Sequence, residues 1–153
     1  MKAITIIQPW ATLIALEEKG LETRSWATKY RGELAIHAGK QIDRGACEQE
    51  PIKSTLAKHG YTADNLPTGA VLAIANLWEC WKIGSDYESG ELILYVKSGR
   101  MAKQVSMKEE AFGWYEEGRY AWEMADIRQL PKPIPAKGQQ GLWNWECGRN
   151  ENC

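Results

Sequence analysis

A short polar segment near the start of the chain gathers side chains that can move protons and stack on a flat ring. Residues 19–26 read Lys-Gly-Leu-Glu-Thr-Arg-Ser-Trp, which places an amine, a carboxylate, two hydroxyls, a guanidinium and an indole within eight positions. Proton donors, an acceptor and a stacking plane in one loop are the components of a ligand site. The same composition is also typical of a surface loop with a structural tryptophan, so both interpretations stay open.

The end of this segment holds the candidate ligand contacts. Trp26 follows Arg24 and Ser25, and we expect its ring to stack on a base. Arg24 is a candidate for phosphate or a base edge, or it pairs with Glu22 or Glu123 and holds the loop in shape. We expect Glu123 to face the same cleft, because it points away from its strand neighbours.

A local basic patch surrounds the segment although the whole chain has a net charge of −1. Six basic and three acidic residues lie between Lys19 and Arg44. Arg31 and Lys40 are predicted to extend a phosphate track, with an ordinary solvated face as the alternative. The balanced overall charge disfavours tight, non-specific binding of duplex DNA.

Several familiar kinds of site are excluded by the sequence. There is no phosphate-binding glycine loop, no Gly-x-Ser-x-Gly elbow and no His-Glu-x-x-His motif, so we expect no P-loop hydrolysis and no cofactor. The four cysteines, Cys47, Cys80, Cys147 and Cys153, lack zinc-ligand spacing, which predicts four thiols and no metal. No apolar run reaches the length of a membrane span, and we expect a cytoplasmic protein.

The hydrophobic spacing predicts the elements that hold these side chains. Strands are expected at residues 2–8, 33–38, 70–83, 91–97, 119–130 and 142–146. Helices are expected from Trp10 to near Gly20, after Asp43 and Ser54 on either side of Pro51, and from a capping box at Ser106 to near Gly118. The strand at 33–38 is expected to have one wet face that includes His37. The prolines at 131–135 are expected to form an edge or crossover connection.

These elements predict an α+β domain over residues 1–148 with a flexible tail at 149–153. Five to six strands with three to four short helices do not follow the rhythm of a doubly wound sheet, and a small mixed β-barrel with helices outside fits better.

Several separate blocks of the sequence resemble the ASCH domain, named for homology to the activating signal cointegrator 1 protein. The blocks are Gln-Pro-Trp-Ala at 8–11, Glu-Thr-Arg-Ser-Trp at 22–26, Tyr-Arg-Gly-Glu-Leu at 30–34, Pro-Thr-Gly-Ala-Val-Leu at 67–72, Tyr-Ala-Trp at 120–122 and Gly-Leu-Trp at 141–143. The resemblance implies a PUA-like fold with a cleft between the barrel and the loop after the first helix. It also implies binding of RNA, single-stranded nucleic acid or a modified nucleoside.

The resemblance leaves the activity open. One bacterial branch hydrolyses N4-acetylcytidine with a Lys, a Thr and a Glu, which implies catalytic roles for Lys19, Thr23 and Glu79 here. Lys19 and Thr23 are four positions apart, where that branch has a three-residue step. Another member has been described as a ribonuclease, and a third possibility is a protein-interaction module with an empty cleft.

Overall fold

The computed structural model describes residues 1–96, 98–99 and 101–153. The chain forms two compact units, each built from separated segments. Unit 1 comprises Met1–Lys19, Glu33–Asn76 and Asp126–Cys153, and unit 2 comprises Gly20–Gly32 and Leu77–Ala125. The polar segment at 19–26 therefore begins with the last residue of one stretch of unit 1 and continues in unit 2.

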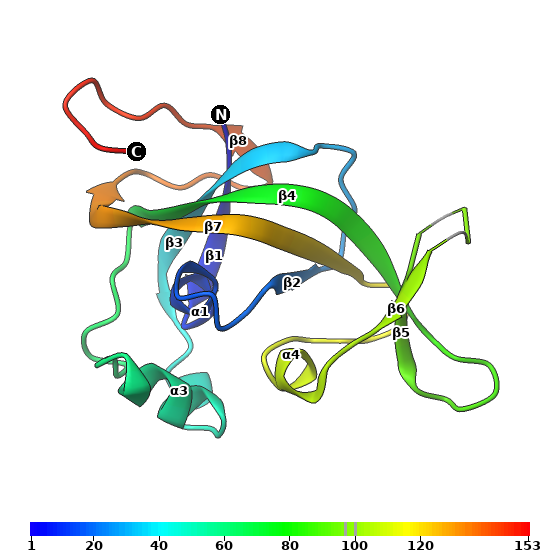
Figure 1. Ribbon diagram of the computed structural model, residues 1–153. Helices are drawn as coiled ribbons and strands as arrows, with labels where there is room; N and C mark the ends of the chain where they lie inside the picture. The colour runs from blue at the N-terminus through cyan, green and yellow to red at the C-terminus, as the bar shows by residue number, and fades with distance from the viewer. Residues whose placement is uncertain (97, 100) are drawn as a thin grey trace. The chain divides into compact units, whose positions relative to one another are not determined.

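Eight strands belong to one hydrogen-bonded sheet, and β4 and β7 each contribute to both units (Figure 1). The strands are β1 (Lys2–Gln8), β2 (Leu21–Arg24), β3 (Gly32–Ile42), β4 (Ala70–Ser85), β5 (Leu92–Tyr95), β6 (Ala102–Gln104), β7 (Tyr120–Pro135) and β8 (Leu142–Asn144). Their order is β2-β7-β4-β3-β1-β8, with β5 beside β4 and β6 beside β5. Among the described residues this path stays open and does not close into a ring.

Unit 1 buries its core around β1. This strand pairs in parallel with β3, where Ala3 lies opposite Ala35, and antiparallel with β8, where Ala3 lies opposite Trp143. Alanine at both positions leaves space for large rings, and Trp143 and Trp145 pack into the same cluster as Val71. The last strand thereby contributes its rings to the core of the unit.

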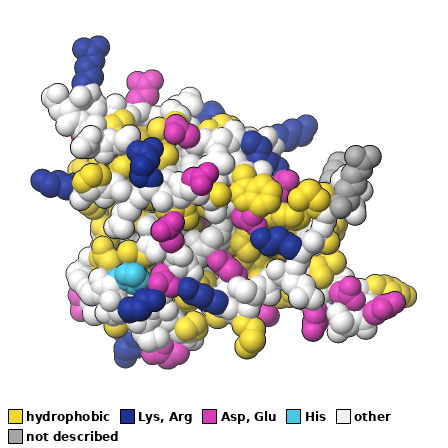
Figure 2. All heavy atoms as spheres, in the orientation of Figure 1, with side chains coloured by type: hydrophobic (Ala, Val, Ile, Leu, Met, Phe, Trp, Pro, Cys, Tyr) yellow, Lys and Arg dark blue, Asp and Glu magenta, His cyan; other side chains and the backbone are white. Residues whose placement is uncertain are grey.

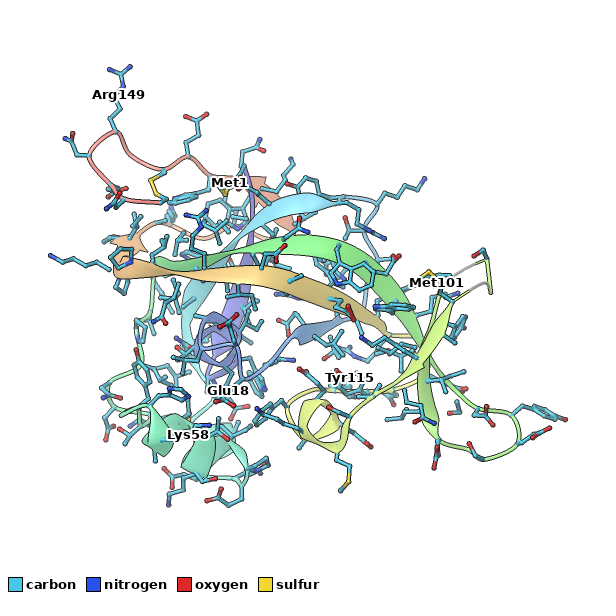
Figure 3. The ribbon with its side chains drawn as sticks, viewed as in Figure 1. Met1, Glu18, Lys58, Met101, Tyr115 and Arg149 are labelled. Atoms are coloured by element: carbon cyan, nitrogen blue, oxygen red, sulfur yellow. A yellow bond between two sulfur atoms is a disulfide. The ribbon has the colours of Figure 1, made fainter. Side chains whose placement is uncertain are left out.

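The described residues also form four short helices. They are α1 (Trp10–Ala15), α2 (Arg44–Cys47) and α3 (Ile52–Lys58) in unit 1, and α4 (Met107–Ala111) in unit 2. The carboxylate of Glu18, just after α1, lies 2.7 Å from Lys58 Nζ and 3.0 Å from His59 Nε2. Figure 3 shows Glu18 and Lys58 next to each other, so this acidic side chain links α3 to the end of α1.

Unit 2 is built on antiparallel pairing. Leu21 of β2 lies opposite Glu123 of β7, and β5 joins β4 and β6 in the hairpin on the right of Figure 1. Its core contains Trp81, Ile83 and Leu94. Ser106 caps the start of α4, and its Oγ accepts the Glu109 N–H at 3.1 Å.

The α+β class is confirmed, and the strand count is larger than expected. Two strands were not predicted: β2 lies inside the segment expected as a loop, and β6 is a short exposed strand. Strand β7 runs through the prolines to Pro135, where a connection was expected. Lys97, the expected last residue of the fourth strand, lies outside the described residues.

Two helices are shorter than predicted. Helix α1 ends at Ala15, because Glu17 adopts a left-handed conformation with φ of 60°. Helix α4 ends at Ala111 and does not reach Gly118. The predicted cap at Ser54 is wrong, since α3 begins at Ile52, directly after Pro51, and Ser54 lies inside the helix. The predicted cap at Asp43 is confirmed, since its Oδ1 accepts the Ala46 N–H at 2.9 Å.

The expectation of a wet face on the strand at 33–38 is wrong. His37 is 2% exposed, and its ring forms hydrogen bonds on both nitrogens. Nε2 lies 2.7 Å from the Ala136 carbonyl, which can only accept, so this nitrogen carries the proton. Nδ1 then accepts from Thr5 Oγ1 at 3.1 Å, and Thr5 Oγ1 accepts from Trp143 Nε1 at 3.1 Å. This polar chain explains why a histidine is tolerated inside unit 1.

We predict that Gly138→Ala destabilises the protein. A Cβ at this position would lie 2.7 Å from His37 Cε1 and 2.8 Å from Thr5 Oγ1, both held in the buried chain. Overpacking of this kind lowers the free energy of unfolding by about 1–3 kcal/mol. Urea denaturation measures the change, with Gly45→Ala in α2 as the control, since its Cβ meets only Asp43 Oδ1 at 3.4 Å. Equal stability of the two variants would contradict the prediction.

The chain ends in a disulfide that corrects the expectation of four thiols. Cys147 and Cys153 are bonded, which leaves Cys47 and Cys80 as free thiols. Within the described residues, none of the helices has the length and apolar character needed to cross a membrane.

Candidate functional site

The residues that the resemblance implies as catalytic lie in both units. Lys19 is fully buried in unit 1, with an exposure of 0%. Thr23 and Glu79 lie in unit 2 and have protein partners: Thr23 Oγ1 accepts the Trp114 N–H at 3.1 Å, and Glu79 Oε1 accepts from Arg31 Nη2 at 2.6 Å. The hydroxyl of Thr23, the implied nucleophile, and the carboxylate of Glu79, the implied proton carrier, are thus both hydrogen-bonded within the protein.

Arg24 and Arg31, both in unit 2, pair with carboxylates. Arg24 Nη2 lies 3.6 Å from Glu22 Oε2, which is one of the alternatives raised by the sequence. Arg31 bonds to Glu79 and also donates from Nη1 to the carbonyls of Thr28 and Tyr30 at 3.0 and 2.9 Å. Both side chains keep exposed surface, 23% for Arg24 and 38% for Arg31. Arg31 therefore shapes the loop while part of its guanidinium stays open to solvent.

The Trp26 ring is half-buried against Trp122. Their centroids lie 4.7 Å apart at an interplanar angle of 84°, and Trp122 Nε1 donates to the Trp26 carbonyl at 3.2 Å. Trp122 is itself fully buried on β7. The loop after β2 is thus anchored at Trp26 by a core residue, which fixes where its exposed neighbour Ser25 lies.

A second aromatic feature of unit 2 is an arginine stacked on an exposed tryptophan. Trp114 is 63% exposed, and the Arg119 guanidinium carbon lies 4.0 Å from the ring centroid. Arg119 is held by its Nε, which donates to the Trp114 carbonyl at 3.1 Å, and by Nη2, which donates to the Thr23 carbonyl at 3.4 Å. The two side chains of this stack are positioned by backbone contacts, and Thr23 connects them to the predicted ligand segment.

A pocket of about 340 Å³ opens in unit 2 beside α4. Its lining includes polar and aromatic side chains from several parts of the unit: Trp78, Lys103, Gln104, Ser106, Glu109 and Glu123. Glu123, predicted to face the cleft, lies in this lining and forms an ion pair with Lys103. Among the described residues, Arg24, Trp26 and Arg31 are not part of it.

The carboxylate of Glu109, in the pocket lining, bonds to the backbone at the start of β2. It accepts the backbone N–H of Gly20 at 2.6 Å and of Leu21 at 3.3 Å. Charge-assisted bonds to backbone donors are among the stronger ones in proteins. They tie α4 to the start of β2 and keep a negative charge at the pocket wall.

Burial and nearby carboxylates make this part of unit 2 unfavourable for further negative charge. Burial raises the pKa of Tyr115 well above its usual range, and Glu109 and Glu22 raise it further. Tyr115, which Figure 3 shows beside α4, has a buried hydroxyl with no hydrogen-bond partner among the residues described. Burial also raises the pKa of the Cys80 thiol, next to Glu79. Burial therefore favours the neutral, protonated form of both groups.

Lys40, a predicted phosphate contact, is exposed on β3 in unit 1. In the described part of the chain, no group of three or more His, Cys, Asp or Glu side chains is placed to hold a metal ion.

Comparison with known proteins gives the family. The ASCH domain profile matches residues 4–134, which is most of the sequence. This chain belongs to the ASCH domain family. No curated protein matches it.

Two solved structures show what the ASCH chain is similar to in space. The crystal structure of ASCH from Zymomonas mobilis has 14% sequence identity and a TM-score of 0.50, with 95% of this chain and 87% of that chain covered. A tyrosine-to-phenylalanine mutant of the Zymomonas mobilis protein has 14% identity and a TM-score of 0.49, with 95% and 89% covered. The fold of this ASCH domain is therefore similar to that of the Zymomonas mobilis ASCH structure, in agreement with the fold expected for the family.

The sequence analysis of the ASCH domain missed four side chains of unit 2: Trp78, Lys103, Trp114 and Arg119. Trp78 lies in a continuous apolar run, where a buried position was the natural expectation, yet it is 40% exposed. Trp114 follows the short α4, and the turn glycine Gly118 brings Arg119 back over its ring. The one local signal for this stack is that Trp114 fits no periodic pattern and is followed, four residues later, by Gly118 and Arg119.

Proposed function

We propose that this ASCH domain binds single-stranded RNA through unit 2. The observation that carries the proposal is the Trp114–Arg119 stack, which is joined through Thr23 to the segment that the sequence singled out for ligand binding. An exposed indole backed by a guanidinium is pre-organised to stack on an unpaired base, because neither group has to be ordered on binding.

The charges of the domain support binding of a single strand. Arg24 and Arg31 keep exposed surface, and a guanidinium has more donors than one carboxylate can accept. Phosphate contacts from such side chains position the strand while aromatic rings hold the bases. In this proposal Arg24, Ser25 and Trp26 line the strand, and Lys40 is a separate phosphate contact on unit 1.

Hydrolysis of an acylated nucleoside is the alternative enzyme function. It requires Lys19 to assist deprotonation of Thr23, Thr23 to act as nucleophile and Glu79 to carry the proton. In the structure the implied nucleophile and proton carrier are engaged by Trp114 and Arg31, which supports binding over hydrolysis. Incubation with N4-acetylcytidine and mass spectrometry of the products separates the two: acetate release that disappears in Thr23→Ala would establish the enzyme.

We predict that Arg24→Gln and Lys40→Gln weaken RNA binding and reduce its salt dependence. Removing one phosphate contact lowers the slope of log affinity against log salt by about 0.7 for a single strand. Fluorescence anisotropy of a labelled single-stranded RNA at several salt concentrations measures both effects. A DNA strand of the same sequence shows whether the sugar is read.

The control for these charge substitutions is Lys53→Gln. Lys53 is an exposed lysine of unit 1 that pairs with Glu48 and has no part in the proposed site. If Arg24→Gln and Lys40→Gln matched this control in affinity and in salt slope, the assignment of these residues would be wrong. Absence of RNA binding by the unmodified chain would overturn the proposed function itself.

A further inference from the structure

The pocket of unit 2 combines an aromatic wall with negative charge. Trp78 presents 40% of its surface and meets Trp81 edge to face, with centroids 6.0 Å apart. Glu109 and Glu123 contribute carboxylates to the lining, and the Glu123 side chain is only 12% exposed. Figure 2 shows hydrophobic, acidic and basic side chains side by side over the right part of the view, where Figure 1 has β5 and β6.

The ammonium of Lys103 already lies beside the pocket carboxylate of Glu123. Lys103 of β6 forms an ion pair with Glu123, and its Nζ lies 5.7 Å from the centroid of the Trp81 ring. A cation near a tryptophan and a largely buried carboxylate gains from both contacts. Lys103 is 41% exposed on a strand whose residues are all exposed, so its ammonium can leave for solvent without disturbing the core.

The charges of the lining disfavour the phosphate of a nucleotide. A phosphate in the pocket would face the two carboxylates of Glu109 and Glu123, while the one ammonium in the lining, that of Lys103, is already paired with Glu123. A volume of about 340 Å³ is at the lower end of the range for small-molecule sites and admits one base or nucleoside. A flat ring that carries a positive charge can stack on Trp78 and pair with the carboxylate of Glu123.

We propose that this pocket binds a positively charged, methylated nucleobase, whose charge takes the place of the Lys103 ammonium at Glu123. The proposal rests on the proposed function, because it names the base that the RNA-binding domain selects. The base stacks on Trp78, and Glu123 pairs with the cationic ring. The released Lys103 is then available to a phosphate of the same strand.

The test compares two isomers, 1-methyladenosine and N6-methyladenosine. The first is a cation at neutral pH and the second is neutral, while the two have the same ring system and one methyl group each. Isothermal titration calorimetry with the full chain is expected to show roughly tenfold tighter binding of 1-methyladenosine, the size of a favourable cation–π and carboxylate contact.

Two substitutions in the pocket give opposite expected results. Glu123→Gln keeps the shape of the side chain and is expected to abolish the preference for the cationic isomer. Lys103→Gln removes the internal competitor and is expected to tighten binding of 1-methyladenosine several-fold. Glu88→Gln, a carboxylate-to-amide change at the exposed β4–β5 turn, is the matched control and leaves the preference unchanged.

Each result decides the proposal. Equal binding of the two isomers, binding of neither, or a preference that survives in Glu123→Gln would overturn it. RNA binding measured by anisotropy separates this inference from the proposed function: a chain that binds RNA with no preference for the cationic nucleoside keeps the function and loses the inference. A chain that binds 1-methyladenosine with the expected preference but no RNA loses the function and retains a nucleoside pocket.

Discussion

Trp122→Ala is expected to lower the free energy of unfolding by about 3–5 kcal/mol, the range for removing a fully buried large ring. Trp122 is 0% exposed and lies opposite Glu22 in the pairing of β2 with β7. The substitution leaves a cavity beneath the Trp26 ring and removes the donor to the Trp26 carbonyl. Denaturation in urea followed by far-ultraviolet circular dichroism measures the loss without relying on tryptophan fluorescence.

Trp122→Phe separates packing from hydrogen bonding at the same position. Phenylalanine keeps an apolar ring but lacks the indole N–H, so the expected loss is smaller, about 1–3 kcal/mol for a partly buried acceptor left without its donor. A stability of Trp122→Ala within about 1 kcal/mol of the unmodified chain would show that the loop after β2 does not depend on this anchor.

Local patterns predicted the elements whose structure is decided by nearby residues. The strand at the start of the chain was predicted with its observed bounds, because its three isoleucines and Thr5 favour a strand and Pro9 ends it. The long strand from Ala70 was predicted from continuous hydrophobicity, which a strand with a neighbour on each side requires. The caps at Asp43 and Ser106 were predicted since each side chain bonds to an amide three residues later.

Contacts between distant residues explain the features that the patterns missed. Glu109 was predicted to complete a capping box with Ser106, and its carboxylate instead accepts the amides of Gly20 and Leu21, far earlier in the chain. The polar residues of β2 form a strand only because β7 pairs with them. His37 is buried because Thr5 and Ala136 satisfy its ring, which no alternation of residues reveals.

In the candidate site, too, residues that are neighbours in sequence could be predicted, and residues brought together by the fold could not. The segment from Thr23 to Trp26 could be selected from sequence because unusual residue types lie next to one another. Its partners could not, since Trp114 and Arg119 reach Thr23 only through the fold of unit 2. Alternation predicted that Glu123 faces a cleft shared with Arg24 and Trp26, whereas the pocket that Glu123 lines contains neither of them and was not foreseen.

Trp114→Ala is expected to weaken binding of single-stranded RNA by about 1–3 kcal/mol, which is roughly 5- to 150-fold in Kd. The substitution removes the exposed ring and leaves Arg119 with its backbone acceptor on Thr23, so the positive charge of the site is retained. The loss is therefore expected to be similar at every salt concentration, in contrast to the shallower salt dependence of Arg24→Gln.

Two further variants make this result specific to the stacked ring. Tyr87→Ala removes a fully exposed aromatic ring at the β4–β5 turn and is expected to leave the anisotropy titration unchanged. Arg119→Lys keeps the charge but loses the planar group over Trp114, and an intermediate loss of affinity is expected. Because Trp114 is largely exposed, unfolding curves of Trp114→Ala should overlay those of the unmodified chain. Equal RNA affinity in Trp114→Ala and Tyr87→Ala would show that bases do not stack at this position. The proposed function would then depend on the other proposed contacts, which are Arg24, Ser25, Trp26, Arg31 and Lys40.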